Sequence, residues 1–420
     1  MNIRWIACCV VACLILARSA WGEDWTRFRG PHGAGVASAP NLPVEWTLDD
    51  YAWSTELEAL GHSSPVVQGN RLFVSTGSKD GTQRKLLCLD ASNGKVLWTR
   101  ALTLSQDKMH SQSSYASSTP ALSDETVVAT FADDKHYMAA AYQLDGTPRW
   151  QRDIGKFDGE HGHGASPIIW NDIVIIPNDQ DGESSYVALA EATGEVLWRK
   201  TRESGVASYS TPLILESSAG QPQLITTSNG MGMTSLDPAT GRILWSTNSL
   251  PQRTVSSPVM GDDLIFQSCG AGGRGHLLVG VDPSLESADE SRVEFKIEKR
   301  IPYVPTPIFY EGHLYLWGDN GVVMCVKPTS AEPVWVERAD GDFSSSPICV
   351  NGCLYNVSED GEVVAIRAAP QFEVLGRSPL GEASQATPAV AGGRMYFHTA
   401  NHVKCLAPKA AEPRQISDAQ

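Results

Sequence analysis

SSPVVQGNRLFVSTGSKDGTQRKLLCLDASNGKVLWTR, residues 63–100, contains four short apolar runs separated by turn residues. The runs lie at residues 65–67, 71–74, 85–89 and 95–98. The first turn, Gly69-Asn70, is a two-residue sequence typical of tight hairpins, and Ser92-Asn93-Gly94 forms a second turn before the last run. The segment therefore predicts one antiparallel sheet of four short strands that ends at a tryptophan.

This unit repeats along the chain. At eight places a Ser-Pro or Thr-Pro dipeptide precedes a short apolar run, and the steps between these places are 40 to 55 residues. The prolines are Pro65, Pro120, Pro167, Pro212, Pro258, Pro307, Pro347 and Pro388. A period of about 40 to 50 residues suits a four-stranded module rather than a pair of helices.

The ends of the chain complete the repeat. The fourth run of most modules carries an aromatic residue, with Phe295 in the fifth module and Gly376 in the seventh where others have tryptophan. The eighth module stops after its third run, whereas residues 51–57, around Trp53, form an unpaired fourth run. We therefore predict an all-β, eight-bladed β-propeller of four-stranded blades over residues 51–407, closed by an N-terminal strand that completes the last blade.

The pattern Leu-Asp-x-x-Thr/Asn-Gly-x-x-Leu-Trp, as in residues 89–98, resembles the tryptophan-docking repeat of PQQ-like, or quinoprotein-type, β-propellers. Residues 25–31, 115–120, 161–167 and 208–212 resemble a bacterial, exported branch of this family. The resemblance covers essentially the whole chain after residue 22. It implies that the repeated tryptophans pack on the neighbouring blade as structural residues: Trp53, Trp98, Trp150, Trp198, Trp245 and Trp335.

Residues 1–22 resemble a secretory signal peptide, with basic Arg4, an apolar run over 5–16 and a cleavage site near Gly22. The run is too short to span a bilayer, so we predict a periplasmic or secreted protein. A lipoprotein signal at Cys13 is the less favoured alternative. We expect residues 23–50 to pack on the propeller as an N-terminal extension, and residues 408–420 to form a C-terminal tail.

The charge excludes one class of partner. The chain has 33 Lys and Arg against 48 Asp and Glu, a formal net charge of −15, which argues against nucleic acid. Six cysteines remain after residue 22, and their disulfide state is left open. In the hairpin 348–354, Val350 faces Cys353, which disfavours a Cys349–Cys353 bridge. We expect a monomer whose partner is an unidentified envelope protein or small ligand.

The loops that enter the inner strands reach the central funnel and carry the candidate ligand-binding residues. These candidates are His62, His110, Tyr115, His161, His163, Tyr209, Arg253, Tyr303 and Gln385. Histidine, tyrosine and arginine suit an anionic or aromatic ligand. His161-x-His163 has no third ligand nearby, so no metal site is predicted. Asp319-Asn320-Gly321 is interpreted as a turn.

Three functions remain open. The first is an exported, non-catalytic binding or scaffold propeller of the cell envelope, since the sequence lacks a Gly-x-Ser-x-Gly motif and its histidines have no evident nucleophile partner. The second is a PQQ-dependent dehydrogenase with calcium. The family resemblance implies a quinone held between a Trp and adjacent cysteines, but the adjacent pair here, Cys8-Cys9, lies in the signal peptide. The third is a funnel enzyme acting on a small ligand or carbohydrate. We expect no cofactor and assign no catalytic residue.

Overall fold

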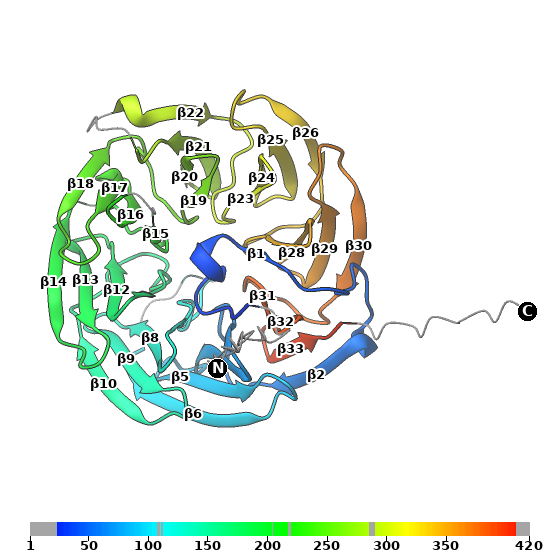
Figure 1. Cartoon of the computed structure of the whole chain (residues 1–420). Helices are drawn as coiled ribbons and strands as arrows, with labels where there is room; N and C mark the ends of the chain where they lie inside the picture. Colours follow the sequence, from blue (N-terminus) through cyan, green and yellow to red (C-terminus); the bar gives the residue numbers. More distant parts are fainter. Residues whose placement is uncertain are drawn as a thin grey trace, which may run out of the picture.

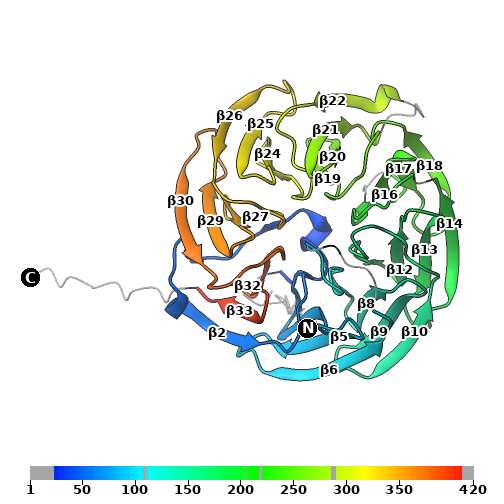
Figure 2. The same ribbon diagram turned by 180° about the vertical axis from the view of Figure 1, so that it is seen from behind.

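The computed structural model describes residues 23–106, 110, 112–203, 205–216, 220–284 and 290–408. These residues form an eight-bladed β-propeller, in which eight antiparallel sheets are arranged radially around a central axis (Figures 1 and 2). Helical structure in the described residues is limited to three short 3₁₀ helices: η1 (Pro31–Gly33), η2 (Leu48–Asp50) and η3 (Glu290–Arg292). The predicted fold class is confirmed. The predicted signal peptide lies outside the described residues, as do residues 409–420 of the tail.

Each blade runs from an inner strand at the axis to an outer strand at the rim (Figure 1). Blade 1 consists of β3 (Val66–Gln68), β4 (Arg71–Gly77), β5 (Gln83–Asp90) and β6 (Val96–Thr103). Blade 2 consists of β7 (Ala121–Leu122), β8 (Thr126–Ala132), β9 (Tyr137–Gln143) and β10 (Pro148–Asp153). Blade 3 consists of β11 (Ile168–Trp170), β12 (Ile173–Asn178), β13 (Ser184–Ala190) and β14 (Val196–Arg202). Blade 4 consists of β15 (Leu213–Leu215), β16 (Gln223–Ser228), β17 (Gly232–Leu236) and β18 (Ile243–Thr247).

The second half of the ring repeats this order. Blade 5 consists of β19 (Val259–Gly261), β20 (Leu264–Ala271), β21 (Arg274–Val281) and β22 (Val293–Ile297). Blade 6 consists of β23 (Ile308–Tyr310), β24 (His313–Trp317), β25 (Val322–Val326) and β26 (Pro333–Arg338). Blade 7 consists of β27 (Ile348–Val350), β28 (Cys353–Val357), β29 (Glu362–Arg367) and β30 (Val374–Pro379), with β1 (Val36–Ala37) added in parallel to β27. Blade 8 consists of β31 (Ala389–Ala391), β32 (Arg394–His398), β33 (His402–Leu406) and β2 (Tyr51–Glu56).

Blade 8 joins the two ends of the chain. Strand β2 pairs antiparallel with β33, in a register that places Tyr51 opposite Leu406 and Glu56 opposite His402. The last sheet thus contains strands from both ends, and blade 8 packs on blade 1. This pairing confirms the predicted closure and leaves no blade incomplete, which removes an exposed sheet edge at the seam.

The rim tryptophans contact the blade that follows in the ring. Trp98 Nε1 donates to the Leu144 carbonyl of blade 2 and Trp150 Nε1 donates to the Glu191 carbonyl of blade 3. Trp53, Trp198 and Trp335 donate in the same way to Ala91, Pro238 and Ala369. Trp245 differs, because its Nε1 donates to Gln223 of its own blade while Arg292 covers its ring at 4.7 Å.

Glycines in the receiving turns make room for these rings. A Cβ on Gly194, whose φ is +68°, would lie 2.6 Å from the Trp150 ring. Both the left-handed backbone and the close approach therefore require glycine there.

The N-terminal extension crosses the ring from its axis to its rim. Trp25 forms a bridge with Val67 on the inner strand of blade 1, and β1 then adds to blade 7 near the axis (Figure 1). At the rim, the carbonyl oxygen of Val44 would lie 2.3 Å from a Cβ on Gly376. The extension thus fills the place on blade 7 where other blades carry an aromatic residue.

The core is formed between neighbouring blades. The largest cluster of buried apolar side chains joins the extension to blades 1, 7 and 8 and includes Trp25, Trp46, Tyr355 and Phe397. All six cysteines of the described residues are buried and free. Val350 pairs with Cys353 and Cys349 with Leu354, as predicted for this hairpin.

Candidate functional site

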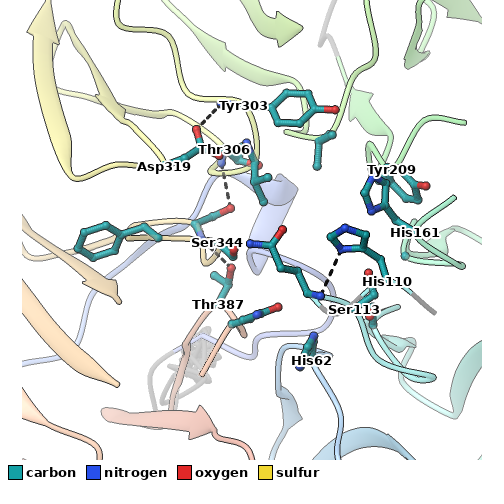
Figure 3. A pocket seen from close by; sticks show the side chains of 18 of the residues that line it. His62, His110, Ser113, His161, Tyr209, Tyr303, Thr306, Asp319, Ser344 and Thr387 are labelled. Carbon is teal, nitrogen blue, oxygen red and sulfur yellow. Dashed lines mark hydrogen bonds between the residues drawn. The ribbon is translucent and has the colours of Figure 1, made fainter. Parts of the chain in front are cut away.

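A cavity of about 750 Å³ lies on the propeller axis. It is lined mainly by the loops that lead into the inner strands, with further residues from turns between the second and third strands of blades 5, 6 and 7, so each blade contributes to its wall (Figure 3). Such a volume is typical of sites for small molecules. The repeated Ser/Thr-Pro dipeptides are part of this wall, because the hydroxyl residue before each of the eight prolines lines the cavity. These residues are Ser64, Thr119, Ser166, Thr211, Ser257, Thr306, Ser346 and Thr387.

The hydroxyl residues also connect the blades. The amide of Thr306 donates to Oγ of Ser346 at 3.0 Å, and Oγ1 of Thr306 accepts from the amide of Ser257 at 3.0 Å. The same bond joins Ser64 to Thr119, Thr119 to Ser166, Thr211 to Ser257 and Ser346 to Thr387. A proline follows each hydroxyl residue because φ near −65° and a missing N–H suit the start of an inner strand, which lies at a sheet edge.

Eight of the nine predicted residues line the cavity, and Tyr115 does not. Its ring instead lies under the Arg84 guanidinium, 4.4 Å from ring centroid to Cζ, and packs closely on Gly77 and Gly81. A Cβ on Gly81 would lie 2.5 Å from this ring. Tyr115 thus fills the interface between blades 1 and 2, a contact that depends on two glycines more than 30 residues earlier in the chain.

One side of the cavity carries basic and aromatic groups. The rings of His110 and His161 meet edge to face with centroids 4.5 Å apart, and the Tyr209 ring lies 6.1 Å from His161 (Figure 3). The Arg253 guanidinium lies 6.0 Å from the Tyr209 ring. Glu160 is the carboxylate on this side, 3.7 Å from His161 Nε2 and 3.9 Å from Arg253 Nη2.

Burial and neighbouring charge affect the protonation of this group. Burial, followed by the charges of His110 and Arg253, lowers the pKa of His161. Burial also raises the pKa of Tyr209 to about 12. At neutral pH we therefore expect neutral His161 and Tyr209 side chains beside a charged Arg253, which keeps its proton in proteins.

His163 has a structural environment although it lines the cavity. The Tyr137 hydroxyl donates its hydrogen to the Pro177 carbonyl at 3.0 Å. In its 2.6 Å contact with His163, the Tyr137 hydroxyl oxygen is therefore the acceptor and the imidazole Nε2–H is the donor. The His163 ring also contacts Phe157, and burial lowers its pKa to about 3. His161 and His163 therefore face different surroundings, His161 the basic side of the cavity and His163 the buried interface between blades 2 and 3.

His62 is a second buried histidine. Burial, followed by the charge of His398, lowers its pKa to about 4. Its backbone amide is held by Ser114 Oγ and the Ala116 carbonyl, which fixes the loop between blades 8 and 1.

The side of the cavity that faces His161 is acidic. Asp319 accepts hydrogen bonds from the Tyr303 amide at 2.7 Å and the Val304 amide at 3.0 Å, and burial raises its pKa. Glu359 accepts from the Ser344 hydroxyl at 2.5 Å, and exposed Asp342 completes this side. Figure 3 shows Asp319 and Ser344 across the cavity from His161 and Tyr209.

Sequence reasoning missed Asp319, Glu359 and the floor of the cavity. Asp319 belongs to a turn that the sequence explains by turn chemistry alone, yet its carboxylate orients the loop of Tyr303. The floor includes Phe28 of the N-terminal extension. Ser64 lines the cavity just before strand β3, while Val67 within β3 pairs with Trp25, so the extension lies below the cavity on the axis.

Two arginines anchor this floor. The buried Arg29 guanidinium donates to the carbonyls of Pro347 at 2.7 Å and Pro307 at 2.8 Å, and also to Thr306, Gly33 and Ala34. Arg27 donates to the Pro212 carbonyl at 2.6 Å. Inner strands have an unpaired edge toward the axis, and the arginines supply the donors that these buried carbonyls need. Burial lowers the pKa of Arg29 to about 9, so it stays charged at neutral pH.

The cavity does not fit the quinone sandwich that the family resemblance implies. Among the described residues that line it there is no tryptophan and no cysteine. The described residues also contain no group of three or more His, Cys, Asp or Glu side chains arranged to hold a metal ion.

Eight four-stranded blades, a closing N-terminal strand and rim tryptophans that dock on the next blade define a PQQ-like β-propeller. The family model described as outer membrane protein assembly factor BamB matches residues 46–183, 139–284 and 294–414. The chain belongs to this family.

Solved structures show the same fold at low sequence identity. BamB from Moraxella catarrhalis superposes with a TM-score of 0.62 at 14% identity, over 86% of this chain and 98% of that one. Quinohemoprotein alcohol dehydrogenase from Comamonas testosteroni gives a TM-score of 0.69 at 13% identity, over 93% and 82%. The computationally designed Ika8 protein gives 0.58 at 12% identity, over 85% and 99%. A comparison with curated proteins finds no significant match. These likenesses establish the fold and leave the role of the cavity open.

Proposed function

We propose that this protein is an exported, non-catalytic binding propeller of the cell envelope, which holds a ligand or a segment of a partner at the funnel face. The observation that carries the proposal is the asymmetry of the axis. One end is filled by the N-terminal extension through Arg29, whereas the other holds a cavity of about 750 Å³ lined by polar loops. A rigid frame with a polar cavity at one end suits recognition.

The surroundings of the cavity histidines support a non-catalytic role. In the described part of the chain, no imidazole of the cavity hydrogen-bonds a serine, threonine or cysteine side chain. His163 donates to Tyr137, and His110 Nδ1 accepts from the Gln112 amide at 3.3 Å. Nucleophilic catalysis requires such a pair of base and nucleophile. The cysteines are buried, and burial raises the pKa of Cys349 and of Cys88 to about 12, which suppresses the reactive thiolate.

The cell-envelope location is supported by the family and by the predicted signal peptide. The relative from Moraxella catarrhalis is a BamB protein, and the family model is described as an outer membrane protein assembly factor. No helix within the described ranges is long and apolar enough to cross a membrane. Cell fractionation and the mass of the purified protein test the location, with cleavage near residue 22 as the expected result.

Photo-crosslinking in intact cells tests binding at the funnel face. Benzoylphenylalanine replaces Gln385, which lines the cavity, or Asp172, which lies in the turn at the far end of blade 3's inner strand. We expect a discrete crosslinked adduct that forms from position 385. A screen of small molecules is the second measurement, and we expect a change in melting temperature that depends on position 385. Equal crosslinking at both positions, or neither an adduct nor a shift, contradicts the proposal.

The same protein tests the quinone alternative. Mature protein is incubated with PQQ and Ca²⁺ while the quinone absorbance and the melting temperature are followed. A ligand that binds only the native state raises the melting temperature. We expect no shift, and a shift that disappears in a His110→Ala variant would instead place the quinone in this cavity.

A further inference from the structure

We propose that the cavity binds a zwitterionic ligand of the amino-acid or short-peptide class, with its carboxylate at Arg253 and His161 and its ammonium group at Asp342 and Glu359. This inference rests on the proposed binding function and specifies its ligand. It depends on the uneven distribution of charge around the cavity and on one largely buried cation, Arg253, whose nearest carboxylate is exposed.

Arg253 is that cation. Its side chain is only 15% exposed, and its Nε is buried without a hydrogen-bond partner in the described part of the chain. Its nearest carboxylate, Glu160, is 3.9 Å away and 66% exposed, a contact that solvent screens strongly. A buried guanidinium is costly unless paired, and its planar set of donors matches a carboxylate better than any other common group.

The neighbours of Arg253 complete an anion-binding surface. His161 lies 3.7 Å from the same Glu160 oxygen, and its ring contacts both His110 and Tyr209. Neutral imidazole and phenol groups each offer a hydrogen-bond donor without the repulsion of another full charge. The Arg253 backbone is fixed by a bridge to Gly270, so the guanidinium is held at the wall by the strand of blade 5.

The side of the cavity that faces His161 favours a cation. Asp342 and Glu359 line the cavity in blade 7, and the Glu359 amide donates to the Asp342 carbonyl at 2.8 Å, which holds the two residues together. Asp319 adds to the negative potential although its oxygens are used by two backbone amides. Figure 3 shows Asp319 and Ser344 facing His161 and Tyr209 across the cavity.

A single charge does not suit this arrangement. A simple anion at Arg253 is repelled by the carboxylates of blades 6 and 7 and by the formal net charge of −15. A simple cation is repelled by Arg253. A ligand with one charge at each end satisfies both sides. Between the ends, hydroxyls such as Thr306 accept from a backbone amide and retain an O–H donor, which suits peptide carbonyls.

Isothermal titration with capped peptides tests the inference. The probes are trialanine with free ends, its N-acetylated form, its C-amidated form and the doubly capped form. Alanine and longer alanine oligomers serve as a length series. We expect the free form to bind most tightly and each cap to weaken binding by at least about tenfold, which corresponds to about 1.4 kcal/mol.

Two variants assign the ends. Arg253→Gln should remove the discrimination against the C-amide and keep that against the N-acetyl group, whereas Asp342→Asn combined with Glu359→Gln should do the reverse. Arg242→Gln and Asp172→Asn are matched controls at exposed positions and should change neither. Each variant is compared with the parent by melting temperature, so that unfolded protein is not counted as loss of binding.

Several results overturn the inference. Equal affinity for the four trialanine forms does so, as does tighter binding of the N-acetylated than of the free form. Failure of every free alanine probe, while position 385 still crosslinks a partner, overturns the ligand class and leaves the binding function standing. Failure of crosslinking and of the screen contradicts the binding function itself.

Discussion

The amide of Thr306 donates a 3.0 Å hydrogen bond to Oγ of Ser346, in the next blade of the ring. Thr306 Oγ1 in turn accepts from the Ser257 amide of the preceding blade. The backbone amide and the side chain of one buried residue thus link three blades, and equivalent bonds recur around the axis. The Ser/Thr-Pro repeat therefore encodes the contacts between blades as well as the start of each inner strand.

Replacing Thr306 with valine tests this ring of bonds. Valine keeps the shape of the side chain but leaves the buried Ser257 amide without its acceptor. An unsatisfied buried amide costs about 1–3 kcal/mol, so we expect the free energy of unfolding in urea to fall by that amount. Thr306→Ser keeps the hydroxyl and is the control. Equal stability of the valine and serine variants would contradict the role of the bond.

Arg29→Lys tests how the extension is anchored. Lysine keeps the charge but has three donors in place of five, and it cannot span the carbonyls of Pro307 and Pro347 together with Ala34. We expect a loss of at least about 2 kcal/mol in the free energy of unfolding, because buried carbonyls lose their donors. Arg242→Lys, at an exposed position, is the matched control, and an equally small loss in both variants would contradict the anchoring.

The sequence predicted what depends on local patterns. Tight turns such as Gly69-Asn70, together with the spacing of the Ser/Thr-Pro dipeptides, placed every blade, and Trp53 indicated the closing strand. Each of these signals lies within one module, or in the comparison of one module with the next. The loops before the prolines also indicated which side chains reach the axis, and eight of nine do so.

Contacts between distant modules could not be predicted in this way. Tyr115 turns away from the cavity because Gly77 and Gly81 of the previous blade leave space for its ring. His163 is held by Tyr137, 26 residues earlier. Arg29 bonds to carbonyls 277 and 318 residues away in sequence, and Phe28 beside it reaches the cavity; no local pattern predicts such contacts. Gly376, which replaces the aromatic residue of other modules, is the one departure from the repeat that corresponds to packing of the extension.

A pair of glycine variants separates backbone strain from tryptophan docking. Gly194 and Gly312 have φ of +68° and +73°, but a Cβ on Gly194 meets the Trp150 ring at 2.6 Å and one on Gly312 meets nothing within 4 Å. Both alanine variants should lose about 1 kcal/mol from the left-handed backbone. Gly194→Ala should lose about a further 1–3 kcal/mol from overpacking. Thermal and urea unfolding measure the difference in stability between the two variants. Equal losses would show that the Trp150 ring can move at no energetic cost.

The buried histidines predict a loss of stability in mild acid. Burial lowers the pKa of His163 to about 3, and that of His398 to about 4, against about 6.5 in an unfolded chain. Between these values the unfolded state binds more protons than the folded state. The contribution of each neutral imidazole to the free energy of unfolding is therefore fully present above pH 6.5, and it is lost as the pH falls toward 4. Each such group contributes a slope of about 1.4 kcal/mol per pH unit.

The difference between variants isolates this effect from that of the carboxylates, which titrate in the same range. His163→Gln keeps an N–H donor for Tyr137 and does not titrate, so the free energy of unfolding should fall less steeply from pH 6.5 to 4, by about one proton. His136 is the control of opposite sign, since Asp153 at 2.6 Å raises its pKa. Its contribution is present below pH 6.5 and is lost as the pH rises, so His136→Gln should not flatten the acid limb. A slope that is unchanged in His163→Gln would mean that this imidazole accepts its proton in the folded state, and that the interface between blades 2 and 3 is open to water.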